Sequence, residues 1–126
     1  MTPGLLTALR EYNAGRFFEC HEALEELLDD TAEEDWNFIL GLIQVAVGYH
    51  KLTAGHPGGE KMLAKGIAKL APYPDDHQGL DLRRLRRGVE ADVARIAEAR
   101  RDGVDVALEP PQLLPVAARV SPRASR

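Results

Sequence analysis

The stretch from Phe38 to Tyr49 constrains the fold most strongly, because Gln44 is its only conventionally polar side chain. A helix that is apolar on every side has to be surrounded by other elements of the fold. No run in the chain reaches the roughly 20 apolar residues that a bilayer-spanning helix requires. The stretch therefore predicts a buried helix at the centre of a helical bundle.

Two glycines mark one side of this central helix. Gly41 and Gly48 lie seven residues apart in the sequence, on the same side of the helix. Glycine inside a helix costs about 1 kcal/mol relative to alanine, so the two residues need a reason to be there. We predict that a neighbouring helix approaches closely along this stripe.

Proline and glycine divide the rest of the chain into further helical segments. Thr2 and Pro3 suit the cap and first turn of a helix, and Asp81 caps a last helix with apolar residues at every third or fourth position. No segment alternates polar and apolar residues as a strand would. We predict an all-α fold, a single compact bundle of about five helices, over residues 2–12, 16–29, 34–54, 60–71 and 82–103.

The bundle domain is expected to span residues 1–103, and a proline-rich tail to span residues 104–126. Regular helix is excluded in this tail by four prolines, namely Pro110, Pro111, Pro115 and Pro122. The tail can dock as an extended strand around Leu113 and Leu114, or it can remain mobile. Mobility is expected from Ser121 onward.

The net charge of −4 conceals a separation of charge. Nine acidic residues lie between Glu19 and Asp35, whereas the last helix carries seven arginines. The simplest interpretation is two solvated faces that attract each other across the bundle. The run Arg83–Arg87 could be a phosphate or nucleic-acid patch, but the overall acidity and the lack of interleaved aromatic residues argue against nucleic acid.

Five polar side chains fall on or beside the apolar stripes of the second and third helices, namely His21, Glu22, Glu25, Gln44 and His50. His21 and Glu25 are four residues apart and can point to a common spot. Burying such groups unpaired costs on the order of 1–3 kcal/mol each. We therefore expect them to meet one another, a backbone group or an ion.

Two hypotheses follow from this cluster. The favoured one is a structural hydrogen-bond network, in which Glu22 or Glu25 accepts from His21 and Gln44 bridges helices. The alternative is a divalent transition-metal site for zinc, iron or manganese with the ligands His21, Glu22, Glu25 and His50. In a metal-dependent hydrolase the metal would activate water and a spare glutamate would act as general base. However, the spacing His-Glu-x-x-Glu differs from the His-Glu-x-x-His pair of zinc proteases.

The other nucleophilic and imidazole side chains look isolated in the sequence. Cys20 precedes His21, but adjacent helical residues point about 100° apart, so Cys20 is expected to be a small buried residue. As the single cysteine it excludes an internal disulfide. His56 and His77 fall in loops and have no companions at the spacing of a metal site or a catalytic triad.

The segment from Phe18 to Leu27 resembles the "aromatic-Glu-x-His-Glu-x-Leu-Glu" signature of a small prokaryotic family, the domain of unknown function numbered 309. A second signature, from Phe38 to Ala46 and followed by His50 and Gly55, matches in order and spacing. Weaker similarity extends the resemblance to roughly residues 6–97, through the segments Lys65–Leu70 and Gly79–Asp81. The chain departs from the family at Leu28, where Trp is common, and at His56, where Asn is common. The resemblance implies an all-helical bundle and no established activity.

We therefore expect a small cytoplasmic binding or scaffold protein, with catalysis left open. The start of the chain lacks a basic region followed by a long apolar stretch, so no secretory signal is visible. The partner would be another protein or a second copy of the chain, which would contact the acidic second helix. Neither a membrane nor nucleic acid is expected as a partner.

Overall fold

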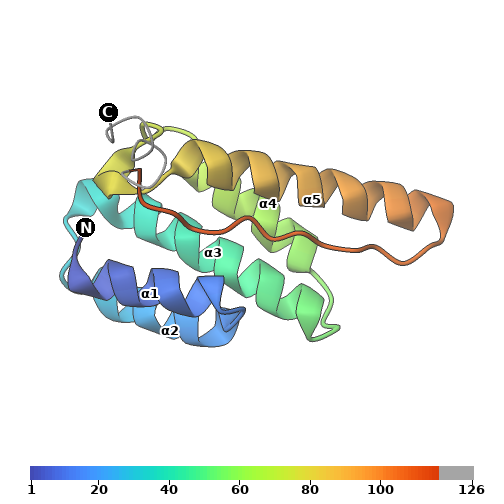
Figure 1. Cartoon of the computed structure of the whole chain (residues 1–126), viewed down its shortest axis with the longest axis horizontal. Helices are drawn as coiled ribbons and strands as arrows, with labels where there is room; N and C mark the ends of the chain where they lie inside the picture. Colours follow the sequence, from blue (N-terminus) through green and yellow to red (C-terminus); the bar gives the residue numbers. More distant parts are fainter. Residues whose placement is uncertain (117–126) are drawn as a thin grey trace, which may run out of the picture.

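The computed structural model describes residues 1–116, and five α-helices build most of this part (Figure 1). They are α1 (Pro3–Asn13), α2 (Phe17–Leu28), α3 (Trp36–Thr53), α4 (Gly59–Leu70) and α5 (Leu82–Asp102), with short 3-10 turns η1 (Glu33–Asp35) and η2 (His77–Gly79). The described residues contain no β-strand, only an isolated bridge between Leu80 and Pro115. The prediction of an all-α bundle is confirmed. No helix within residues 1–116 combines the length and the apolar character needed to cross a membrane.

The helix ends follow the capping residues. The Thr2 hydroxyl accepts a hydrogen bond from the Leu5 N–H at 3.2 Å, and the Asp81 carboxylate accepts one from the Arg84 N–H at 3.2 Å. Gly103 ends α5 in the left-handed conformation, with φ of 68°. Each predicted helix boundary lies within two residues of the observed one, the largest shift being the later start of α3 behind η1.

α3 is the central element of the bundle. It lies between α2 and α4, and it buries both sides of its surface, including Phe38, Leu42, Ala46 and Tyr49. Its neighbours are antiparallel to it, so the start of α2, the end of α3 and the start of α4 lie at the same end of the bundle (Figure 1). This arrangement creates the pocket described below.

Glycines on both helices form the α3–α4 interface. A Cβ atom at Gly41 would lie 3.0 Å from the Gly66 carbonyl oxygen, and one at Gly48 would lie 3.0 Å from the Gly59 carbonyl oxygen. Real Cβ atoms rarely approach a backbone atom so closely, so only glycine fits at this separation. The predicted close approach at Gly41 and Gly48 is confirmed.

Residues 104–115, here called the C-terminal strap, turn back at Gly103 and run along α5 in front of α3 (Figure 1). The Asn13 side chain forms a reciprocal pair with Leu113, donating to its carbonyl at 2.8 Å and accepting from its N–H at 2.7 Å. The Leu113 side chain is buried in the core. The strap thus docks as an extended segment, while the mobility expected from Ser121 onward falls outside the described residues.

The acidic and basic faces do not meet across the bundle as expected. The arginines of α5 that form ion pairs within residues 1–116 reach Asp92 of the same helix and Asp75, Glu109 and Glu60 of other segments. None of these acids belongs to α2, because α3 and α4 separate α2 from α5. The interpretation of two mutually attracting faces is therefore wrong.

Candidate functional site

The five polar residues singled out in the sequence do not form a buried network. α2 buries Phe17, Cys20 and Leu24, and His21, about 100° further round the helix than Cys20, lies at the edge of that face with 19% of its side chain exposed. Glu22 and Glu25 are exposed. The expected network is reduced to one contact between His21 and Glu25, because the helix turns both carboxylates toward solvent.

Gln44 does not bridge helices through its carbonyl oxygen. The Oε1 atom is buried and has no hydrogen-bond partner. An unpaired buried carbonyl of this kind destabilises the fold by about 1–3 kcal/mol.

The two ring nitrogens of His21 both face acceptors. Nδ1 lies 3.1 Å from the Phe18 carbonyl oxygen, and Nε2 lies 3.2 Å from Oε1 of Glu25. A metal-ligating nitrogen needs an available lone pair, so His21 is poorly placed as a ligand in this arrangement. Within residues 1–116 no three His, Cys, Asp or Glu side chains are grouped so that they could hold a metal ion. The proposed metal set of His21, Glu22, Glu25 and His50 is not brought together.

His21 and His50 instead line a pocket of about 390 Å³. The pocket lies where α2 begins, α3 ends and the loop to α4 follows. Its lining consists of Phe18, His21, Val47, His50, Lys51, His56 and Pro57. This site, which we call the His50 pocket, includes His56, a residue that the sequence left without companions.

Four aromatic rings follow one another around the His50 pocket. The ring centroids of Phe18 and His21 are 5.1 Å apart, those of Phe18 and His50 are 5.4 Å apart, and those of His50 and His56 are 6.3 Å apart. Phe18 remains 46% exposed although it is a large apolar side chain. The walls of the pocket are therefore flat, largely apolar and open to solvent.

Local backbone geometry explains why these residues converge. Phe18 and His21 are three residues apart on α2, as are Val47 and His50 on α3, so each pair shares a helix face. After α3 the chain turns at Gly55, whose φ is 75°, and the His56 N–H bonds to the Lys51 carbonyl at 2.8 Å. This C-terminal cap fixes the position of His56 relative to α3.

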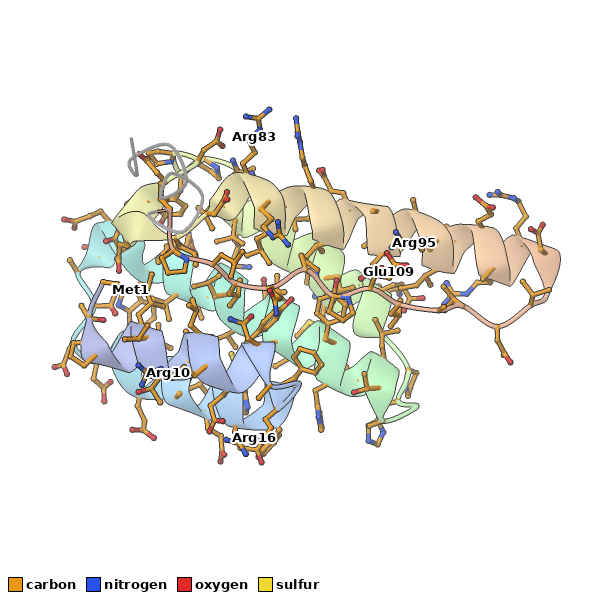
Figure 2. All side chains as sticks on the ribbon, in the orientation of Figure 1. Met1, Arg10, Arg16, Arg83, Arg95 and Glu109 are labelled. Carbon is orange, nitrogen blue, oxygen red and sulfur yellow. The ribbon has the colours of Figure 1, made fainter. Side chains whose placement is uncertain are left out.

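A fully buried carboxylate was missed in the sequence. Asp92 accepts a hydrogen bond from the Tyr49 hydroxyl at 2.6 Å and from the Glu109 N–H at 3.0 Å, and it forms an ion pair with Arg95. Figure 2 shows Arg95 and Glu109 close together where the strap passes α5. Burial and the bond to Asp92 raise the pKa of Tyr49. The signal was an acid one helical turn from both Val89 and Ile96, on an apolar stripe.

His77 also has partners that the sequence did not reveal. Its Nε2 lies 2.8 Å from Oδ1 of Asp35, whose other oxygen accepts from the Gln78 side chain at 2.8 Å. The His77 ring packs against Phe38 and Tyr73. These contacts fasten η2 to the start of α3. They were missed because Asp35 and His77 are 42 positions apart.

A family model described as "Domain of unknown function (DUF309)" matches residues 5–70. The matched stretch includes most of α1, all of α2 to α4 and every residue that lines the His50 pocket, whereas α5 and the strap lie outside it. The resemblance noted in the sequence reached further, to about residue 97. No curated protein matches the chain.

Proposed function

We infer that this chain, which belongs to the DUF309 family of unknown function, binds a small ligand in the His50 pocket. The observation that carries this proposal is the convergence of the two signature segments. Phe18 and His21 come from the first signature and His50 follows the second, and all three line the same pocket. Their shared position supports a common role in binding.

The size and lining of the pocket support the same function. Small-molecule sites usually measure about 300–1,000 Å³ and combine apolar walls with a few polar groups, and the His50 pocket, at about 390 Å³, has both. Phe18 contributes little to the core because nearly half of it is exposed. An exposed aromatic ring at the mouth of a pocket is well suited to contact a ligand.

Binding is better supported than catalysis or metal coordination at this site. Both His21 nitrogens lie beside protein oxygens, of Phe18 and of Glu25, which leaves the ring face to contact a ligand. Ring faces stack on flat apolar groups. The sequence predicted a protein partner or a second copy of the chain, whereas the lining of the pocket favours a ring-containing small molecule.

Nuclear magnetic resonance with the uniformly ¹⁵N-labelled full chain tests this proposal. Mixtures of single-ring compounds should shift the backbone amide signals of Phe18, Val47 and Lys51. Phe18→Ala should weaken that binding about tenfold or more, because a stacked ring contributes about 1–2 kcal/mol including its buried area.

The matched control is Trp36→Ala, which removes an aromatic ring that is 44% exposed, compared with 46% for Phe18, but lies outside the pocket lining. It should leave the binding unchanged. Thermal unfolding of both variants checks that the fold is intact. Compounds that shift signals scattered over other surfaces, or bind equally to Phe18→Ala, would contradict the proposal.

A further inference from the structure

We propose that the ligand of the His50 pocket is a small flat carboxylate, an inference that rests on the binding function proposed above. The first argument is the charge of the lining. Lys51 is the one formally charged side chain among the lining residues, and His50 and His56 add ring nitrogens that can donate hydrogen bonds. Among the described residues 1–116, no aspartate or glutamate contributes to the pocket wall.

The N-termini of the two helices that begin beside the pocket also favour a negatively charged ligand. α2 begins next to Phe18 and α4 begins directly after Pro57 and Gly58, and the capping residues Arg16 and Gly58 provide no side-chain hydrogen bond to either helix. Helix N-termini carry positive partial charge and unsatisfied N–H groups, which favour anions. These two ends add to the positive charge of Lys51.

The helix that ends at the pocket opposes this effect only weakly, because its last carbonyls are already bonded. The His50 carbonyl accepts from the Ala54 N–H at 2.9 Å, and the Lys51 carbonyl accepts from the His56 N–H at 2.8 Å. The Thr53 hydroxyl also donates to the His50 carbonyl at 3.2 Å. A ligand therefore meets few free acceptors from α3.

One acid, Glu25, touches the lining residue His21, and the other acids near the pocket are paired elsewhere or face solvent. Glu25 contacts His21 at 3.2 Å, and Glu60 on the first turn of α4 forms an ion pair with Arg100 of α5. Glu19 and Glu22 are exposed and are not part of the lining. Their negative field makes the Lys51 ammonium essential, because without it the surroundings of the pocket would be predominantly acidic.

The shape of the pocket selects the rest of the ligand. Phe18, Val47 and Pro57 provide apolar surface, and the sequence of aromatic rings favours a planar group that can stack. The volume of about 390 Å³ lies at the lower end of ligand sites. One ring with a carboxylate fits these requirements.

Three probes of nearly equal size test the charge: benzoate, benzamide and benzylamine. Each is titrated into the ¹⁵N-labelled full chain at neutral pH and low ionic strength, and the dissociation constant is taken from the amide shifts of Phe18, Val47 and Lys51. Benzoate should bind about fivefold more tightly than either of the others, the upper end of what one exposed ion pair contributes.

Substitution of Lys51 provides the second arm of the test. Lys51→Gln should weaken benzoate binding about fivefold and leave benzamide binding unchanged. The matched control is Lys65→Gln, at an exposed position of α4 outside the pocket lining, which should affect neither probe.

The outcomes separate the two proposals. If benzamide binds as tightly as benzoate, or if benzylamine binds most tightly, the carboxylate proposal is overturned while the binding site stands. If the three probes shift none of the pocket signals, the binding function itself fails.

Discussion

Asp92 is a fully buried carboxylate on which three elements of the fold converge. It lies on α5, accepts a hydrogen bond from Tyr49 of α3 and holds the strap through the Glu109 N–H. Arg95 supplies the compensating charge. The Arg95 side chain is 40% exposed, so the ion pair itself adds little stability, but removing Asp92 is costly because the groups bonded to it lose their acceptor.

We expect Asp92→Ala to lower the free energy of unfolding by about 3–5 kcal/mol, because the Tyr49 hydroxyl and the Glu109 N–H lose their acceptor and Arg95 keeps only Glu109. Tyr49→Phe should cost less, about 1.5–3 kcal/mol. Urea unfolding measures both. The control is Glu90→Ala, at an exposed position of the same helix, which should change the free energy of unfolding by less than about 0.5 kcal/mol. If Asp92→Ala has an effect as small as that of Glu90→Ala, the structural role of Asp92 is contradicted.

Sequence reasoning succeeded for residues whose environment depends on their own helix, and failed where it depends on distant partners. Cys20 is buried as predicted, because its position relative to Leu24 is set by the helical period. The sequence analysis placed Glu22 and Glu25 too close to the buried face of α2, by about the 100° that separates adjacent helical residues. Asp92 and His77 could not be assigned, because their partners come from elements far away in the sequence.

At the scale of elements, the α3–α4 interface depends on glycines in both helices. A Cβ at Gly66 would lie 2.8 Å from the Gly41 carbonyl oxygen and 2.8 Å from a side-chain methyl of Val45. The backbone oxygen cannot move without shifting α3. Ordinary helix propensity would make alanine about 1 kcal/mol better than glycine at this position, so packing and propensity oppose each other.

We expect packing to dominate, so that Gly66→Ala lowers the free energy of unfolding by about 1–3 kcal/mol in spite of its better propensity. Urea unfolding again provides the measurement. The matched control is Ala68→Gly, at an exposed position of the same helix, which should cost about 1 kcal/mol through propensity alone. If Gly66→Ala stabilises the protein, α3 and α4 can move apart without loss of stability, and the role of the glycines in packing is contradicted.

The same contrast explains what could be predicted of the elements. Helix boundaries were predictable because caps such as Thr2 and Asp81 act locally. The lack of regular helix in the strap was expected from its prolines, which left open whether it docks or stays mobile. Its path could not be predicted, because it depends on Asn13 and on Gly88, where a Cβ would lie 2.4 Å from the Cβ of Pro111. The sequence shows that Gly88 lies inside a helix, but it does not show which segment packs against it.

At the scale of the whole molecule, the antiparallel arrangement of α2, α3 and α4 assembles the His50 pocket. The sequence indicated that Phe18, His21 and His50 belong to signature segments, and an all-helical hairpin places the start of one helix beside the end of the next. The contribution of His56 depends on the loop conformation after α3. The helical residues of the candidate site could therefore be predicted from the sequence. The contribution of the loop, and the fact that these residues line a pocket, could not.

The core also contains three weakly acidic side chains. Because they are buried, the stability of the whole fold should vary with pH in the alkaline range. Burial raises the pKa of the Cys20 thiol to about 12. Burial, with further contributions from Cys20 and Asp92, raises the pKa of the Tyr12 phenol, and burial together with the Asp92 bond does the same for Tyr49. The Tyr12 hydroxyl has no hydrogen-bond partner, so nothing compensates its ionisation.

The sign of the effect follows from proton binding in the two states. An unfolded chain releases the thiol proton near pH 8.5 and the phenol protons near pH 10, whereas the folded chain retains them. Between about pH 9 and the raised pKa values the folded state therefore binds more protons than the unfolded state, and stability decreases as the pH rises. Below about pH 8 these three groups should leave the free energy of unfolding nearly constant. At higher pH the free energy of unfolding should fall, with a slope approaching about 1.4 kcal/mol per pH unit for each group that ionises in the unfolded chain.

Urea unfolding between neutral pH and pH 11, compared with Cys20→Ala, measures the contribution of the thiol. The variant loses a buried sulfur and should be less stable at every pH, so the slope and not the absolute stability is the informative quantity. Between about pH 8 and 9 the variant should show a flatter decline than the native chain, because in the unfolded state the thiol ionises over that range while the phenols stay largely protonated. Above about pH 9 both curves should steepen together as the tyrosines of the unfolded chain ionise. Parallel curves over the lower range would mean that the Cys20 thiol already ionises freely in the folded protein, and that the core at the start of α2 is open to solvent.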